Sequence, residues 1–212
     1  MFRRTAFRCG VLLLCAVGCR ARPAPLAAAD ADNAELQAIV AADQADRQPA
    51  VGAINWADVT PRDAARRTRV LQLIAEDRLR TSKDFEQAAL VFQHGDTSDD
   101  ILLAHVLAVT ALGLGNPRSD GRRMAAITLD RYLTRSGHAQ IFGTQFNTTD
   151  VADSGKWTMD PYNETLLSDT LRRLNCTESR AASRALLTQL KSGVEPEEPP
   201  PVCAPGKPAH AE

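Results

Sequence analysis

Two stretches of the sequence carry polar side chains where the surrounding pattern predicts burial. Gln93 and His94 end one apolar helical run, and Asp130 and Arg131 interrupt another. The segment 140–146, which alternates and places two glutamines around a glycine, follows closely. A buried polar group costs about 1–3 kcal/mol unless it has a partner. This cluster therefore either holds the fold together or holds a ligand.

His94 is the side chain with the widest chemistry, because an imidazole can act as an acid, a base or a metal ligand. The alternative is a capping role, since a donor at a helix end favours the last carbonyl groups. A metal site needs three or four converging ligands, and His105, His138 and the acidic residues are the available partners. His105 lies among apolar residues, as a core histidine does. We therefore expect no metal and no cofactor.

Asp130 and Arg131 are adjacent, so on a helix their side chains point about 100° apart. In a structural reading, a buried Asp130 accepts hydrogen bonds from backbone amides of 140–146 and fixes that segment against the helix. In a functional reading, Arg131 and Gln145 line a cleft that grips a carboxylate or an amide. Gly143 would let the backbone approach such a ligand closely.

The catalytic alternative pairs His94 with Asp130 as acid and base, in a hydrolase or a transferase. No nucleophile beside a base and no phosphate-binding loop is visible, so no catalytic residue is assigned firmly. The candidate ligand-binding residues are Gln93, His94, Asp130, Arg131, Gln140, Gly143, Thr144 and Gln145.

These positions also carry a resemblance to known proteins. The stretches 88–96, 129–133 and 143–146 look like a family of bacterial proteins of unknown function, which has a glutamine–histidine helix end, an Asp-Arg helix and a Tyr-Gly-Thr-Gln segment. The resemblance covers roughly residues 60–175. Phe142 stands in place of the tyrosine, so no role for that hydroxyl is carried over. The family has no established reaction, so the resemblance implies positions and no mechanism.

The N-terminus has the pattern of a targeting segment. Three arginines precede the apolar run 9–18, which is too short to span a bilayer. Cys19 follows small residues, as in the cleavage box of bacterial lipoproteins. We predict that residues 1–18 are a signal peptide, that Cys19 is lipidated, and that the membrane is contacted only through this anchor. The alternative is an ordinary secretory signal that is cut near residue 29.

The remaining chain divides into three parts. Residues 20–31 are predicted to be a flexible tether, 32–192 a single helical domain, and 193–212 a disordered Pro-rich tail. Cys176 and Cys203 are a possible disulfide in an oxidising compartment, and two unpaired thiols are the alternative. The formal charge of −1 argues against nucleic-acid binding.

Apolar periodicity and capping signals predict a mainly α fold of about seven helices. Their approximate ranges are 32–48, 60–80, 82–94, 98–112, 119–136, 163–174 and 179–192. A small β-hairpin is predicted near 140–160, where two alternating runs flank a polar turn. Similar alanine pairs, 37 residues apart at Ala88 and Ala125, resemble tetratricopeptide-type helix pairs, although a compact bundle explains them equally well.

The leading hypothesis is an envelope lipoprotein whose helical domain binds an unknown protein, peptide or small molecule near His94, Arg131 and Gln145. The enzyme with His94 and Asp130 is the second hypothesis, and a purely structural module is the third.

Overall fold

The computed structural model describes residues 31–49, 53–115, 119–150, 152–193 and 202–203. Seven α-helices lie within this part of the chain, so the mainly α prediction is confirmed. They are α1 (Ala34–Ala45), α2 (Trp56–Ala75), α3 (Ser82–Phe92), α4 (Ser98–Gly113), α5 (Ser119–Arg135), α6 (Asp169–Leu174) and α7 (Arg180–Lys191), with a short 3-10 helix η2 at Ser154–Lys156.

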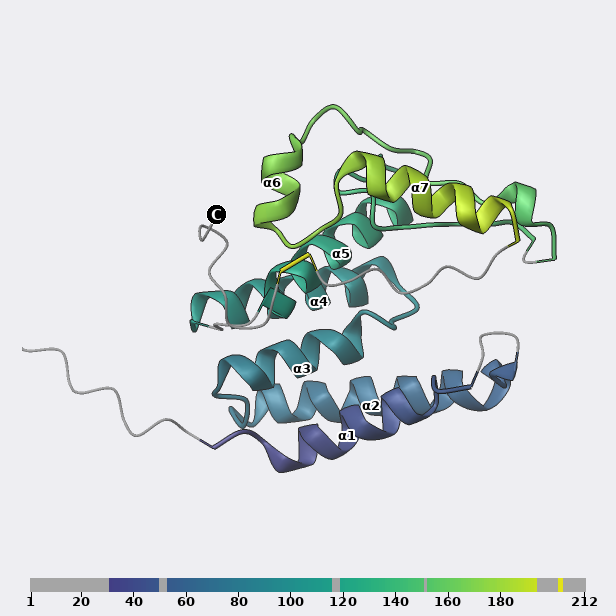
Figure 1. The fold of residues 1–212 in the computed structure, drawn as a ribbon. Coiled ribbons are helices and arrows are strands. Elements are labelled where there is room, and N and C mark those ends of the chain that lie inside the picture. The colour runs from purple at the N-terminus through teal and green to yellow at the C-terminus, as the bar shows by residue number, and fades with distance from the viewer. Residues whose placement is uncertain (1–30, 50–52, 116–118, 151, 194–201, 204–212) are drawn as a thin grey trace, which may run out of the picture.

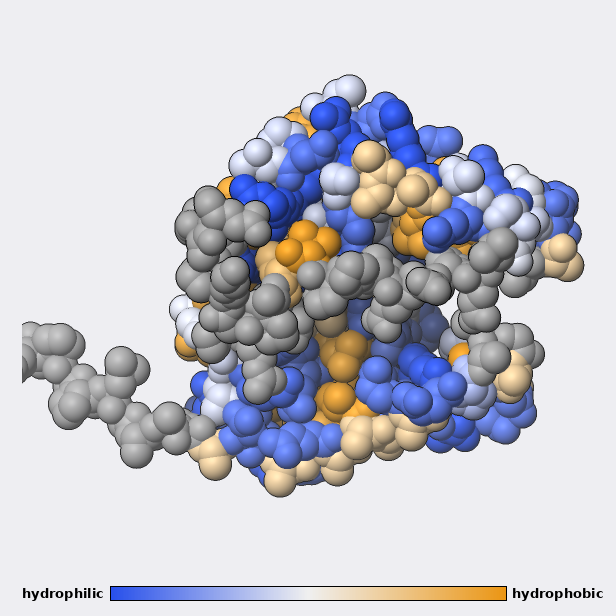
Figure 2. Space-filling view, viewed as in Figure 1, coloured by the Kyte–Doolittle hydropathy of each residue, from blue (hydrophilic) through white to orange (hydrophobic). Residues whose placement is uncertain are grey.

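The helices are arranged in layers. Figure 1 shows α1 and α2 on one side, α3, α4 and α5 in the middle, and α6 and α7 on the opposite side. The most extensive contacts join α4 to α3 and to α5, and α7 packs on η2. In the view of Figure 2, apolar side chains form separate patches above and below the grey atoms, and most of the remaining visible surface is hydrophilic.

The core lies where α1, α2, α4 and α5 surround α3. Its buried residues are Leu36, Val70, Leu73, Leu79, Ala88, Ala89, Val91, Phe92, Ala104, Leu107, Ala108 and Ala125. Alanines from three helices meet here, because short side chains let helix axes approach closely. The alanine pairs therefore have a packing role, and the tetratricopeptide-type repeat predicted from their spacing is not confirmed.

The turn between α3 and α4 fixes the position of the chain around His94. Thr97 and Asp100 form a capping box at the start of α4. A Cβ at Gly95 would lie 2.1 Å from Cβ of Asp100 and 2.9 Å from the carbonyl oxygen of Phe92. Only glycine allows this turn to be so tight, and His94 is thereby held at the end of α3.

The predicted β-hairpin near 140–160 is not confirmed. The described residues of this region form no strand, and one isolated antiparallel bridge joins Asn147 to Thr158. Two local features interrupt a regular ladder. Gly143 has a φ of +71°, and the side chain of Asp130 takes backbone N–H groups that a neighbouring strand would otherwise use.

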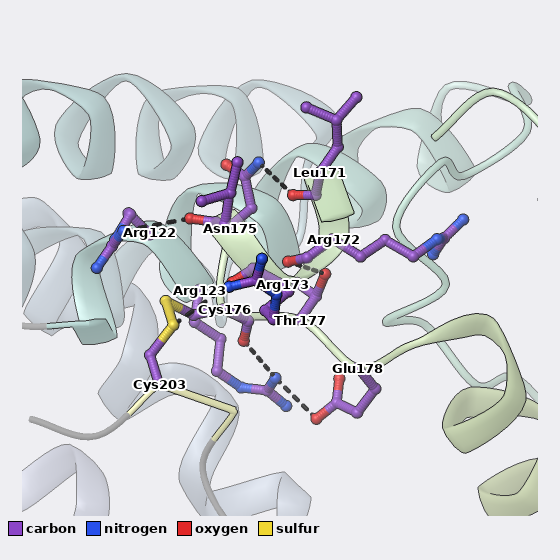
Figure 3. The surroundings of a disulfide bond; sticks show 11 residues. Arg122, Arg123, Leu171, Arg172, Arg173, Asn175, Cys176, Thr177, Glu178 and Cys203 are labelled. Carbon is purple, nitrogen blue, oxygen red and sulfur yellow. Dashed lines mark hydrogen bonds and ion pairs between the residues drawn. A yellow bond between two sulfur atoms is a disulfide. The ribbon is translucent and has the colours of Figure 1, made fainter. Parts of the chain in front are cut away.

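A disulfide joins Cys176, just after α6, to Cys203, which is one of the two alternatives that the sequence left open. Figure 3 shows how the segment that follows α6 and contains Cys176 is held on α5. Arg123 donates a hydrogen bond of 3.2 Å to the carbonyl oxygen of Cys176 and forms an ion pair of 2.8 Å with Glu178. Arg122 donates to the carbonyl oxygen of Leu174.

Several predictions concern residues outside the described ranges. These are the signal peptide 1–18, the lipidated Cys19, most of the tether 20–31 and most of the tail 193–212. Among the described residues, no helix combines the length and the apolar character that crossing a membrane requires.

Candidate functional site

Asp130 anchors the segment 140–146 to α5. Its side chain is completely buried. Oδ1 accepts hydrogen bonds from the backbone N–H groups of Ile141 (2.8 Å) and Phe142 (3.0 Å), and Oδ2 accepts from the N–H (3.0 Å) and the hydroxyl (2.9 Å) of Thr144. A buried carboxylate is stable when it is bonded in this way. The geometry agrees with the structural reading of Asp130.

Arg172 holds the same segment from its carbonyl side, and the sequence analysis missed it. Its fully buried guanidinium donates to the carbonyl oxygens of Phe142 and Ile141, the latter at 2.9 Å. A carboxylate therefore binds the N–H groups of this segment, and a guanidinium binds its carbonyl groups. In the sequence, Arg172 is indistinguishable from Arg173 beside it, which is exposed.

Gln140 and Gly143 also belong to this internal scaffold. Gln140 is fully buried; its amide nitrogen donates to the carbonyl oxygens of Gln145 (2.8 Å) and Met159, and its Oε1 accepts from the N–H of Gln145 (2.9 Å). A Cβ at Gly143 would lie 2.7 Å from the hydroxyl oxygen of Tyr162. Glycine is therefore required at position 143 because Tyr162 packs against it, and not because a ligand approaches the backbone there.

Other predicted residues meet at an open hollow of about 250 Å³. The lining residues come from the turn after α1, from α2 and α5, and from the α3–α4 turn, and they are Arg47, Trp56, Thr60, Asp63, Gln93, His94, Gly95, Asp96, Arg131 and Arg135. Asp130, Gln140, Gly143 and Thr144 are not among them. The predicted set therefore separates into a buried scaffold and an accessible site, and Gln145 connects the two.

His94 bonds with a carboxylate, but that carboxylate is Asp43 of α1. The Nδ1 atom of His94 lies 3.1 Å from Oδ1 of Asp43, whose side chain is 1% exposed. Arg47 donates to the same oxygen at 3.0 Å. An ionised carboxylate only accepts hydrogen bonds, so Nδ1 of His94 carries the proton and donates. The Nε2 atom is the ring nitrogen left for other contacts. The expected pairing with Asp130 is not what the structure shows.

Arg131 and Arg135 are the cations on the α5 side of the hollow. The Nη1 atom of Arg131 donates to the carbonyl oxygen of Gln93 (2.7 Å) and its Nε to Oε1 of Gln145 (3.1 Å). Burial, and secondarily the nearby charge of Arg135, lower the pKa of Arg131. Arg135 donates to the carbonyl oxygen of Asp96 (2.6 Å). Among the described residues, neither guanidinium forms an ion pair with a carboxylate.

The other arginines around the hollow are neutralised. Arg47 forms ion pairs with Asp43 (3.0 Å) and with Asp63 (2.5 Å). Arg67, just behind the lining, forms an ion pair of 2.5 Å with Asp96. The uncompensated positive charge is therefore concentrated on the α5 side of the hollow.

A metal centre has no support in the described ranges, where no group of three or more histidine, cysteine or acidic side chains is placed to hold an ion. The residues of the hollow are instead suited to hydrogen bonding and charge pairing.

Comparisons of the chain with family models, curated proteins and solved structures found no match. The resemblance to a bacterial family stays a prediction. Fold and site together define a mainly α domain with an arginine-lined hollow, and these features carry the functional argument.

Proposed function

We propose that this protein is a non-catalytic binding domain whose hollow takes a ligand that carries an anionic group, a carboxylate or a phosphate. The observation that supports this is the guanidinium of Arg131, which is largely buried and lacks a carboxylate partner among the described residues. Burying a charge is costly unless it is paired. An anionic ligand would supply the missing charge.

Arg131 is prepared for such a ligand. Its bonds to Gln93 and Gln145 use Nη1 and Nε and hold the plane of the guanidinium, while Nη2 makes no hydrogen bond to another described residue. A fixed, planar donor group binds carboxylates and phosphates with little further loss of side-chain entropy. Arg135, one helical turn further along α5, lies on the same side of the hollow.

The hydrolase or transferase remains the second candidate, with a changed pair of residues. The hydrogen bond that His94 donates to Asp43 orients its ring in the way that a carboxylate orients a general base. Thr60 brings a hydroxyl to the lining of the same hollow. A screen of ester and phosphoester substrates would favour this candidate only if turnover disappears in His94→Ala and persists in Asp130→Asn.

The location that we propose is the bacterial cell envelope, with the domain attached through lipid on Cys19. Support comes from the basic and apolar pattern of residues 1–18 and from the disulfide, which forms in oxidising compartments. Labelled palmitate should enter the protein during expression in a bacterium and should be absent from Cys19→Ser. Equal labelling of both proteins, or none of the wild type, would contradict the anchor.

The binding proposal is tested by calorimetry with acetate, phosphate and larger carboxylates at constant ionic strength. We expect Arg131→Gln to weaken binding by about 10- to 150-fold, because hydrogen bonds to charged groups contribute about 1.5–3 kcal/mol. Arg184→Gln is the matched control, since it removes the same charge from the exposed face of α7. Absence of binding to the wild type, or equal loss in both variants, would leave the structural module as the better description.

A further inference from the structure

We infer that the ligand is a carboxylate attached to an apolar or aromatic group, with the carboxylate on Arg131 and Arg135 and the apolar group on Trp56. This inference rests on the proposed function and specifies its ligand class. The chemistry is found in two sources: a free acid, such as an acylated aromatic amino acid, and the C-terminal residue of a peptide.

Trp56 provides the apolar part of the site. It is the first residue of α2, it lines the hollow together with Thr60 one turn later, and 49% of its surface is exposed. Tryptophan and arginine are among the residues enriched in the energetically dominant centres of protein–protein interfaces. An indole offers a large contact area and loses little conformational entropy on binding.

The charge of the lining favours a carboxylate over a phosphate. Three arginines and two aspartates line the hollow, so its net charge is one positive when His94 is neutral. A carboxylate carries one negative charge and matches this value, whereas a phosphate monoester carries about −1.5 to −2 at pH 7. The extra charge would lie close to Asp63 and Asp96. Two planar donor groups also suit the flat geometry of a carboxylate.

The size of the hollow indicates that it binds one end of a ligand and does not enclose a whole molecule. At about 250 Å³, it is smaller than the pockets of about 300–1,000 Å³ that enclose drug-sized ligands. The carboxylate and one apolar side chain would occupy the hollow and its rim, and any remaining part of the ligand would extend outward.

The test compares N-acetylphenylalanine, its uncharged amide, acetate and inorganic phosphate by calorimetry on the full-length protein. We expect N-acetylphenylalanine to bind at least tenfold more tightly than acetate or phosphate and its amide not to bind. Trp56→Ala should reduce its affinity to the level of acetate, and Trp56→Phe, which keeps an aromatic ring, should stay within threefold of wild type. In Trp157→Phe, Trp56 is the sole tryptophan, and its emission should change on binding.

The outcomes separate the two proposals. If acetate, phosphate and N-acetylphenylalanine bind equally well and Trp56→Ala changes nothing, this inference is overturned and the anion site stands. If none of them binds, both fall. The last probe is a peptide that ends in phenylalanine. If it binds more tightly than N-acetylphenylalanine and amidation of its C-terminus abolishes binding, the natural ligand is the end of a peptide. If the two bind equally well, the natural ligand is a free acid.

Discussion

Replacing Asp130 with asparagine tests the buried scaffold directly. The carboxylate accepts hydrogen bonds from four donor groups, the N–H groups of Ile141, Phe142 and Thr144 and the Thr144 hydroxyl. Asparagine keeps one acceptor oxygen, which can still bind Ile141 and Phe142. Its amide nitrogen, however, would face the N–H and hydroxyl of Thr144, which therefore lose their acceptor.

An unsatisfied buried donor costs about 1–3 kcal/mol. The Thr144 hydroxyl can rotate to another partner, which leaves its N–H as the donor without an acceptor, so we expect Asp130→Asn to lose about 1–3 kcal/mol. This is a large share of the 5–15 kcal/mol of typical domains. With an m-value near 2 kcal/mol per M, the urea midpoint should fall by about 0.5–1.5 M.

The assay is equilibrium unfolding in urea, followed by far-ultraviolet circular dichroism. Asp99→Asn is a suitable control, because Asp99 is exposed in the first turn of α4 and its loss should cost less than about 1 kcal/mol. If Asp130→Asn unfolds at the same urea concentration as the wild type, the segment 140–146 does not depend on this carboxylate, and our account of the scaffold is wrong.

Three further predictions concern stability. Arg172→Met should cost about 2–5 kcal/mol in the same urea assay, because two buried carbonyl groups lose their donor; a change below 1 kcal/mol would contradict this. Reducing the Cys176–Cys203 disulfide, whose cysteines are 27 positions apart, should cost about 3–4 kcal/mol by the chain-entropy relation, and an unchanged melting temperature in dithiothreitol would argue against it. Hydrogen bonds from Arg69 hold the pKa of Glu35 below its ordinary value of 4.5. Stability from this pair is thus complete above pH 4.5 and lost as the pH falls through the lowered pKa, so wild type and Glu35→Gln should differ in urea midpoint at pH 7 and converge near pH 2.

The helices could be predicted from the sequence because their signals are local. Thr97 and Asp100 have the spacing of a capping box, and the structure contains that box. The start of α2 was predicted less well, since Thr60-Pro61 reads as a helix start although the helix begins at Trp56. Pro61 is the sixth residue of α2 and lies beyond the N–H groups that need no intrahelical acceptor, so the helix forgoes one i to i−4 hydrogen bond there.

The two halves of the candidate site differed in how far they could be predicted. Asp130 was recognisable because a lone acid in an apolar run must find partners. Arg172 was not recognisable, because half of the residues of α6 are charged and the sequence does not show which of them other elements cover. The hairpin prediction was not confirmed, for a related reason: alternation describes the side chains, whereas N–H groups of 140–146 are bound by Asp130 from another element.

The sequence by itself determined the helical class, the approximate positions of the helices and the residues that break the apolar pattern, because periodicity and capping act over a few residues. Only the tertiary structure decided which polar residues face each other. His94 meets Asp43, 51 positions earlier, and Arg131 meets the end of α3, 38 positions earlier. Such pairings depend on how the helices pack, so the division between a buried scaffold and an open hollow exists only in the folded molecule.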